Sequence, residues 1–382
     1  MFDLERGLAE RRQAGLYRHR RVSESAQGVH QVIDGREVLS FCSNDYLGLA
    51  NHPAIKQAFV DAVQQYGVGS GAAHLISGHS ALHHACEQRL AEFCGRERAL
   101  LFGNGYLANL AVAAALVGRG DRIFQDKLNH ASLIDGARLS GARLRRYRHN
   151  DCGHLETLLV QSGEGGRRLL MTDGVFSMDG DRADLVGISE LCSKHDTVCM
   201  VDDAHGFGVL GKNGGGLVQA LGLGPEQVPV LMATLGKAVG TAGAFVAGSD
   251  ALIETLIQRA RPYIYTTASP PAIAAATLRS LDIVEAEGWR REKLEELVDY
   301  LRAGLTRLGL EPMPSSTPIQ PVIVGDSGRA LSLGEKLLAR NILVPAIRPP
   351  TVPADSARLR ITLSASHEKA DIEHLLKALA GT

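Results

Sequence analysis

The sequence lacks a strong charge of either sign. Its 382 residues include 41 Lys or Arg and 42 Asp or Glu, so the formal net charge is −1 at pH 7. Such a balance gives no indication of nucleic acid or of an acidic membrane surface as a partner. The start of the chain is rich in Arg, but Glu residues are interleaved and no apolar core is present. We therefore do not interpret it as a secretory signal.

Long apolar runs and closely paired cysteines are also lacking. The longest mainly apolar segment, residues 107–117, is too short to cross a bilayer. The six cysteines include no Cys-x-x-Cys pair. In a chain of this length they are most simply reduced thiols, so we expect a cytoplasmic protein and assign no metal to them.

Two common nucleotide-binding signatures are missing. The chain has no P-loop and no complete dinucleotide fingerprint. Residues 67–71 read Gly-Val-Gly-Ser-Gly, but the third glycine of the fingerprint does not follow at the required spacing. A nicotinamide-dependent oxidoreductase is therefore disfavoured.

The chain does contain a repeating pattern of a short apolar segment, a loop and a helix. Five such segments predict strands at residues 99–102, 122–125, 169–172, 198–201 and 230–233. Strands that alternate with helices imply a mainly parallel sheet covered on both faces, so the predicted fold class is α/β. In such sheets, ligands bind at the carboxyl ends of the strands.

The pattern changes near residue 280, where an amphipathic helix at 294–308 begins. It is followed by predicted strands at 320–324, 342–347 and 359–363, and by helices at 330–340 and from Lys369 onward. At the other end, we predict a helix at 3–21 and a hairpin at 31–40 that turns at Asp34-Gly35. We therefore divide the chain into an N-terminal helix and hairpin segment (1–42), a large α/β domain (43–284) and a small C-terminal α+β domain (285–382).

Lys237 is the residue around which we predict a functional site. It follows the apolar strand at 230–233 and lies in a glycine-rich sequence. Burial lowers the pKa of an ammonium group, and a neutral amine can form a Schiff base. The alternative is an ordinary solvated loop lysine, and only the other strand ends distinguish between these interpretations.

A second strand, at 198–201, ends in Asp202, with His205 three residues later. A carboxylate at a buried strand end needs a cationic or hydrogen-bonding partner. Asp202 is either part of a structural ion pair, a helix cap, or the anionic partner of a heteroaromatic cation. His205 alone would be interpreted as a buried core histidine.

Three further strand ends carry polar groups. Gly105 and Tyr106 stand between a strand and a helix, where free N–H groups form an anion site suited to phosphate, although an ordinary turn is the alternative. His130 is placed to stack on an aromatic ligand or simply to neighbour a helix cap. Ser177 offers a hydroxyl in a tight turn. Together with Lys237 and an acid, these are the groups that pyridoxal 5′-phosphate requires.

Four motifs resemble those of the α-oxoamine synthases, which are fold-type I, aspartate-aminotransferase-like pyridoxal phosphate enzymes. They are SNDYLG at 43–48, FSMDG at 176–180, VDDAHG at 201–206 and TLGK at 234–237. The resemblance extends from near residue 18 to the C-terminus. Within the family, residues 347–353 and 358–360 are similar to members that join L-alanine to a pimeloyl thioester in biotin synthesis.

The resemblance implies a role for each candidate residue. The implied catalytic residues are Lys237 as Schiff-base lysine and general base, Asp202 at the pyridine nitrogen, His205 at the phenolic oxygen and His130 stacked on the ring. The implied phosphate contacts are Gly105, Tyr106, Ser177, Thr234 and, reaching the cofactor of a partner subunit, Thr267. The implied substrate contacts are Arg18, Asn44, His130, Thr351 and Arg360, the last binding the amino-acid carboxylate.

The activity implied is a decarboxylative condensation of L-alanine with pimeloyl-CoA or a pimeloyl carrier protein, catalysed by a homodimer. An alternative is a glycine C-acetyltransferase that uses acetyl-CoA, and residues 349–353 disfavour it. A cofactor-free scaffold subunit is disfavoured by the presence of Lys237, Asp202 and His130. The chain departs from the family at 72–75, where Ala-Ala-His-Leu replaces a loop rich in Gly and Ser. This departure leaves the shape of the substrate entrance open.

Overall fold

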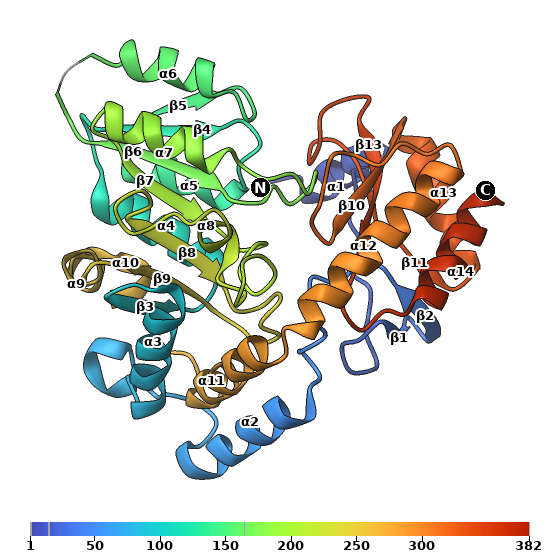
Figure 1. Cartoon of the computed structure of the whole chain (residues 1–382), viewed down its shortest axis with the longest axis horizontal. Helices are drawn as coiled ribbons and strands as arrows, with labels where there is room; N and C mark the ends of the chain where they lie inside the picture. The colour runs from blue at the N-terminus through green and yellow to red at the C-terminus, as the bar shows by residue number, and fades with distance from the viewer. Residues whose placement is uncertain (1, 14–15, 164, 382) are drawn as a thin grey trace.

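The computed structural model describes residues 2–13, 16–163 and 165–381. Its larger part is built on a seven-stranded sheet with the strand order β3-β9-β8-β7-β6-β4-β5 (Figure 1). The strands are β3 (Arg98–Phe102), β4 (Arg122–Asp126), β5 (Arg143–Tyr147), β6 (Arg168–Asp173), β7 (Val198–Asp202), β8 (Val230–Thr234) and β9 (Ala244–Gly248). Neighbours from β8 to β5 are parallel, whereas β9 runs antiparallel to both β3 and β8. The predicted mainly parallel sheet is therefore confirmed.

Helices cover both faces of this sheet because successive strand residues point to opposite sides. In β7, Met200 packs into the cluster beneath one set of helices, whereas Cys199 and Val201 pack into the cluster on the other face. The first face is covered by α4 (Gly105–Leu116), α5 (Ala131–Ser140), α9 (Asp250–Arg259) and α10 (Arg261–Ile264). The second is covered by α6 (Cys152–Val160), α7 (Leu185–Lys194) and α8 (Gly216–Ala220).

A smaller C-terminal part follows the long helix α11 (Pro271–Ala286), which packs against α2 (Pro53–Tyr66) and α3 (Ala81–Cys94). It contains α12 (Trp289–Arg307), β10 (Ile319–Gly325), α13 (Ser327–Ala339), β12 (Ala346–Ile347), β13 (Ala357–Thr362) and α14 (Lys369–Ala380) (Figure 1). The antiparallel sheet β10-β13-β12 carries the apolar face of α13. The change in sequence pattern near residue 280 thus corresponds to a change of architecture.

The single strand predicted at 342–347 is wrong. The segment forms two short strands, β11 (Ile342–Leu343) and β12, that belong to different sheets. Pro345 lies between them and has no N–H to donate to a ladder. Its carbonyl instead accepts a hydrogen bond from the Arg360 N–H at 3.0 Å, at the point where the chain passes from one sheet to the other.

The N-terminal hairpin is present as predicted, with β1 (His30–Ile33) and β2 (Arg36–Ser40). Its turn residues Asp34 and Gly35 both have positive φ, at 51° and 72°, as a two-residue hairpin turn requires. Strand β2 also pairs with β11 in parallel, so this hairpin shares a sheet with the C-terminal part. The predicted boundary at 284/285 falls inside the last turn of α11. The three-part division itself stays a prediction.

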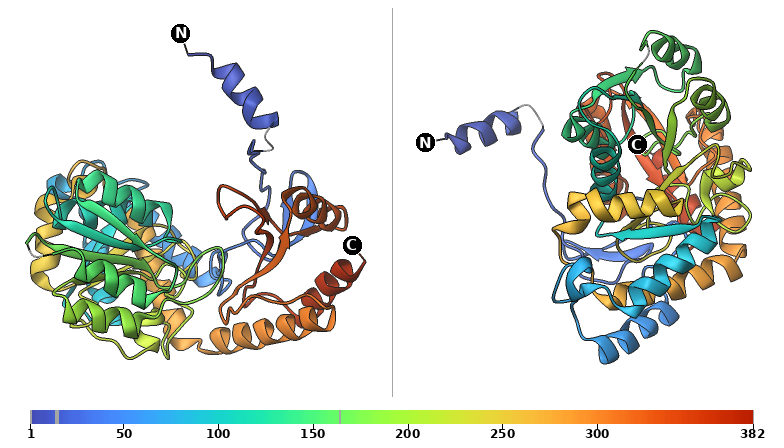
Figure 2. Two further views of the ribbon diagram at one scale, coloured as in Figure 1. Left: turned by 90° about the horizontal axis from the view of Figure 1, so that it is seen from above. Right: turned by 90° about the vertical axis from the view of Figure 1, so that its left-hand side faces the viewer.

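The first helix is shorter than predicted. Helix α1 (Leu4–Gln13) buries none of its residues and projects away from the rest of the molecule (Figure 2). Of the predicted helix at 3–21, residues 14–15 lie outside the described residues and 16–21 are not helical. Because most helical stability in proteins comes from a packed face, an unpacked helix has little to extend it. No helix in the described ranges has the length and hydropathy of a membrane span.

Candidate active site

Polar side chains converge at the carboxyl ends of the parallel strands, around a cavity of about 200 Å³. Its lining includes most of the cofactor contacts predicted from the sequence, namely Gly105, Tyr106, His130, Ser177, Asp202, His205, Thr234 and Lys237. It also includes polar residues that the sequence did not single out, namely Asn109, Ser132 and Asp173. The parallel strands β4, β6, β7 and β8 bring these positions to one edge of the sheet.

Lys237 lies in this cavity and not in an open loop. Its Nζ atom is 2.9 Å from Nε2 of His205. Burial lowers the pKa of Lys237 from its ordinary value of 10.5 to about 8, although Asp202 and Asp173 act in the opposite direction. A large fraction of this amine is therefore neutral near pH 8, which is the state needed for attack on a carbonyl carbon.

His205 connects Lys237 to a chain of hydrogen bonds. Its Nδ1 atom lies 2.7 Å from the hydroxyl of Tyr46, which in turn donates to Oδ1 of Asn44 at 3.1 Å. Because the Tyr46 proton goes to Asn44, Nδ1 of His205 is the donor and Nε2 accepts from Lys237. Burial, followed by the charge of Lys237, lowers the pKa of His205 well below its usual range, which favours this neutral form. His205 is therefore buried, as a core histidine would be, but it also contacts Lys237 directly.

The same chain reaches Arg360 on β13 in the smaller part of the molecule. Arg360 donates through Nε to the carbonyl of Ser177 at 2.6 Å and through Nη2 to Asn44 at 3.4 Å. The guanidinium is buried, with 6% of the residue exposed. Two of the predicted substrate contacts, Asn44 and Arg360, thus lie side by side, next to the cavity-lining residue Ser177.

Asp202 ends β7 as a buried carboxylate held by N–H donors. Its Oδ2 atom accepts from Asn109 Nδ2 at 2.7 Å, and its Oδ1 atom accepts from the N–H of Ala204 at 3.1 Å. Among the described residues it forms no salt bridge with Arg or Lys, so the structural ion pair considered above is not what holds it. A buried anion that faces a cavity suits the protonated nitrogen of a heteroaromatic ring.

His130 is itself the N-cap of α5, where its Nδ1 atom meets both the N–H and the hydroxyl of Ser132. The backbone N–H of His130 donates to Oδ2 of Asp173 at 2.8 Å. The Ser132 hydroxyl also accepts a hydrogen bond from Nδ2 of Asn109 at 2.8 Å, and the same nitrogen donates to Asp202. The side chains of Ser132 and Asn109 therefore connect His130 to Asp202. The cap fixes the ring at the cavity wall, and the two interpretations of His130 are therefore compatible.

The first turn of α4 is the segment predicted to bind an anion. Asn104 caps the helix by accepting the N–H of Leu107 at 2.9 Å, which leaves the N–H groups of Gly105 and Tyr106 without intrahelical partners. These donors and the positive end of the helix dipole suit a phosphate. Nearby, the Thr234 hydroxyl lines the cavity and donates to the carbonyl of Gly243 at 3.0 Å.

Besides Asn44 and Arg360, three predicted contacts are not part of the lining of this cavity. Thr267 is exposed and pairs with Ala73 in an isolated bridge. Thr351 is exposed in a turn after the cis peptide bond between Pro349 and Pro350. Arg18 is exposed on the segment that follows α1. Their roles stay predictions.

Sequence reasoning missed Asn109, Ser132 and Asp173, although signals existed for two of them. Asn109 is a lone amide in a helix composed otherwise of Gly, Tyr, Leu, Ala and Val, and its Oδ1 atom is buried without a hydrogen-bond partner. Asp173 ends β6 in direct register with Asp202. Burial, followed by the charge of Asp202, raises the pKa of Asp173 well above its usual range. This shift favours the neutral form of Asp173.

Comparisons with known proteins identify the family of the chain. The model of the aminotransferase class I and II family matches residues 36–379. An 8-amino-7-oxononanoate synthase from Thioalkalivibrio sulfidiphilus is 58% identical over 379 residues, which cover 99% of this chain and 97% of the relative. The synthase from Nitrosococcus oceani is 58% identical over 372 residues, covering 97% and 98%. The chain belongs to the 8-amino-7-oxononanoate synthase family.

Solved structures of related enzymes share the whole fold. A serine palmitoyltransferase variant from S. paucimobilis, with a bound aldimine of pyridoxal phosphate and myriocin, matches with a TM-score of 0.93 and 29% identity over 99% of this chain and 96% of that one. An 8-amino-7-oxononanoate synthase from Francisella tularensis matches with a TM-score of 0.79 and 33% identity over 90% and 97%. The predicted fold-type I architecture and the predicted dependence on pyridoxal phosphate are therefore confirmed.

Proposed function

We propose that the protein condenses L-alanine with a pimeloyl thioester to give 8-amino-7-oxononanoate, carbon dioxide and a free thiol, as a step in biotin synthesis. The observation that carries this proposal is the position of Lys237, which lies in a cavity with Asp202 and contacts His205. It stands in a chain that is 58% identical to a synthase of that name over 99% of its length.

The residues present fit pyridoxal phosphate. Lys237 would hold its aldehyde carbon, Asp202 its ring nitrogen, and His130 one ring face. The free N–H groups at the start of α4 would hold its phosphate. The buried Oδ1 atom of Asn109, which lacks a partner, lies on the residue that also orients Asp202. When bound, the cofactor supplies an electron-accepting ring that stabilises negative charge at the alanine Cα.

The chain's own residues position the substrates and move the protons. Arg360 would bind the alanine carboxylate, because a planar guanidinium matches its two oxygens. The amine of Lys237, with its pKa near 8, would take the Cα proton of alanine and later return a proton to the same carbon. His205, which accepts a hydrogen bond from Nζ, would hold that amine in place. Between these transfers, the alanine Cα bonds to the thioester carbonyl carbon, the thiol leaves, and the alanine carboxylate departs as carbon dioxide.

Mass spectrometry of the products from a panel of amino acids and acyl thioesters tests this proposal. We expect alanine with a pimeloyl thioester to give the main product, with pimeloyl-CoA and pimeloyl carrier protein compared as donors in the same panel. Glycine with acetyl-CoA should be a poor pair. If that pair outperforms alanine with the pimeloyl donors, the acetyltransferase alternative replaces this assignment.

We further propose that the protein acts as a homodimer. Thr267 is exposed and Tyr265 is 71% exposed, and a second copy would give this segment a cofactor phosphate to contact. Helix α1 exposes Leu4 and Leu8 at 72% and 43%, which is an apolar surface that a partner subunit would cover. Light scattering at assay concentration tests the proposal, and a fully active monomer would contradict it.

A cytoplasmic location stays a prediction from the unpaired cysteines.

A further inference from the structure

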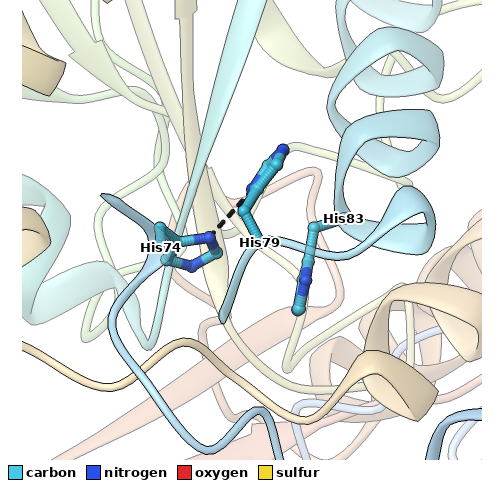
Figure 3. Close-up of side chains that lie close together, drawn as sticks. All are labelled: His74, His79 and His83. Carbon is cyan, nitrogen blue, oxygen red and sulfur yellow. Dashed lines mark hydrogen bonds between the residues drawn. The ribbon is translucent and has the colours of Figure 1, made fainter. Parts of the chain in front are cut away.

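A histidine-rich segment runs from the π-helix η1 (His74–Gly78) into the first turns of α3. None of its histidines lines the cavity around Lys237. Three of its side chains, His74, His79 and His83, lie close together (Figure 3). The segment overlaps residues 72–75, where we expect the sequence to depart from the family pattern. The proposed function uses none of these histidines.

His83 already uses both of its ring nitrogens. Its Nδ1 atom accepts from the N–H of Ser80 at 3.1 Å and lies 3.0 Å from the Ser80 hydroxyl, as part of the cap of α3. Its Nε2 atom donates to the carbonyl of Ser269 at 2.8 Å. No lone pair of His83 is left for another ligand, so the three histidines in Figure 3 are not a ready metal site as a trio.

His79 differs from His83 because one of its nitrogens is turned to a different neighbour. Its Nδ1 atom lies 3.0 Å from Nδ1 of His74, and its other nitrogen points away from that contact (Figure 3). That Nε2 atom is 3.9 Å from Oε2 of Glu87. His74 is buried and stacked on Tyr263, with ring centroids 5.0 Å apart. When the proton shared between the Nδ1 atoms of His74 and His79 is on His79, the Nε2 atom of His79 has a free lone pair.

Glu87 and His84 lie three residues apart on α3 and therefore share a helix face. Glu87 accepts the N–H of Leu101 through Oε1 at 2.9 Å, which fixes the carboxylate and leaves Oε2 toward His79. His84 is exposed, and both residues border an open cavity of about 500 Å³. Arg98, in the wall of that cavity, is already paired with Asp250 at 2.7 Å. An ion could thus enter from solvent.

We propose that Nε2 of His79, the imidazole of His84 and Oε2 of Glu87 bind a divalent transition-metal ion of the zinc type. Two histidines and one carboxylate are a common protein ligand set for zinc, with water at the fourth position. One ligand atom from each of the three residues lies within 4.8 Å of the other two, and Nε2 of His79 is 3.9 Å from Oε2 of Glu87. Tetrahedral ligands of zinc lie roughly 3.4 Å apart. Rotation of the exposed His84 side chain can supply the remaining approach. The contact between the Nδ1 atoms of His79 and His74 would be the outer contact that orients a metal-bound imidazole.

Such an ion would join the loop at His79 to helix α3. The chain leads back from this loop through η1 to Ala73, which pairs with Thr267. The ion would therefore steady the surface segment that carries Thr267, without contacting the reacting atoms.

The test uses the tag-free holoenzyme after dialysis against a chelator. Titration with Co²⁺, followed by its visible ligand-field absorption, should show one ion bound per chain, and Zn²⁺ should displace it. His84→Ala should weaken binding more than about 100-fold, because loss of a ligand costs more than loss of an outer contact. His74→Phe, which removes only the outer contact, should weaken binding by about 10- to 100-fold.

His374→Ala is the matched control, because His374 is an exposed helical histidine three residues after an acid, Asp371. It should leave Co²⁺ affinity unchanged. Absence of Co²⁺ binding by the wild type would overturn the proposal, and so would equal binding by the wild type and His84→Ala. Loss of binding in His83→Gln with retention in His84→Ala would overturn it in favour of the trio in Figure 3. Circular dichroism and cofactor absorption should confirm that each variant is folded.

Discussion

The amine of Lys237 should destabilise the cofactor-free protein at neutral pH, and Lys237→Met should remove that cost. Burial lowers the pKa of Lys237 from 10.5 to about 8. This fall corresponds to roughly 3 kcal/mol of unfavourable free energy for the charged, folded state, as an upper limit because water in the cavity screens the charge. Methionine keeps a similar length without the charge. For a chain of this size, 3 kcal/mol raises the melting temperature by about 4 °C.

The difference in stability between the wild type and Lys237→Met should depend on pH. Below pH 8 the amine is protonated in both the folded and the unfolded states, so the folded wild type carries the full cost. Between pH 8 and 10.5 the unfolded chain binds the proton and the folded protein does not, so wild-type stability rises with pH relative to the variant. Above pH 10.5 the difference should vanish.

Thermal unfolding of both cofactor-free proteins from pH 6 to pH 10.5 measures this difference. Lys127→Met, at an exposed lysine, is the control and should show little difference at any pH. A constant difference between Lys237→Met and the wild type across this range would refute the reasoning, because it would show that Lys237 is not held with a lowered pKa. Turnover by the holoenzyme should be lost in Lys237→Met in any case.

Three further predictions concern the substrates. Asp202→Asn should slow deuterium exchange at the Cα of alanine by orders of magnitude, and normal exchange would show that another acid, such as Asp173, serves the ring nitrogen. Arg360→Lys keeps the charge but loses the planar pair of donors, so the KM for alanine should rise about 10- to 100-fold with a smaller change in kcat, as steady-state kinetics would show. Arg18→Ala should lower kcat/KM for the pimeloyl thioester while alanine affinity, read from the cofactor spectrum, stays nearly intact. Unchanged kinetics would mean that Arg18 belongs to a solvated basic surface.

Five strands of the sheet, including edge strand β3, were predictable as apolar segments, whereas β5 and β9 were not. The core of β7 reads as a continuous apolar run because both of its faces are covered. Edge strand β5 reads Arg-Leu-Arg-Arg-Tyr and is only partly buried, so its composition is that of a surface loop. Strand β9 is also apolar, but glycines surround it, and its antiparallel direction depends on a turn that periodicity does not reveal.

The same division holds for the site. Residues that end central strands, such as Asp202 and Lys237, were predictable, because parallel strands must bring their carboxyl ends to one edge. Contacts on surface segments, such as Thr267 and Thr351, came only from the family resemblance. The structure of one chain leaves them away from the cavity, which is the expected result if a partner subunit or a bound substrate supplies their contacts. Strand ends are fixed by backbone pairing, whereas these segments depend on what binds to them.

Asn109 shows why the polar residues of this site act as one unit. Its amide nitrogen donates to both Asp202 and Ser132, and Ser132 meets the His130 ring. Replacement by leucine would leave the buried carboxylate of Asp202 without one of its donors, a loss of about 1.5 to 3 kcal/mol for a bond to a charged group. Asp202, with fewer donors to hold its carboxylate in place, would then be a poorer partner for a charged ring nitrogen. Asp202 therefore depends on α4, a helix on one face of the sheet, whereas Lys237 contacts His205, whose other partner is Tyr46.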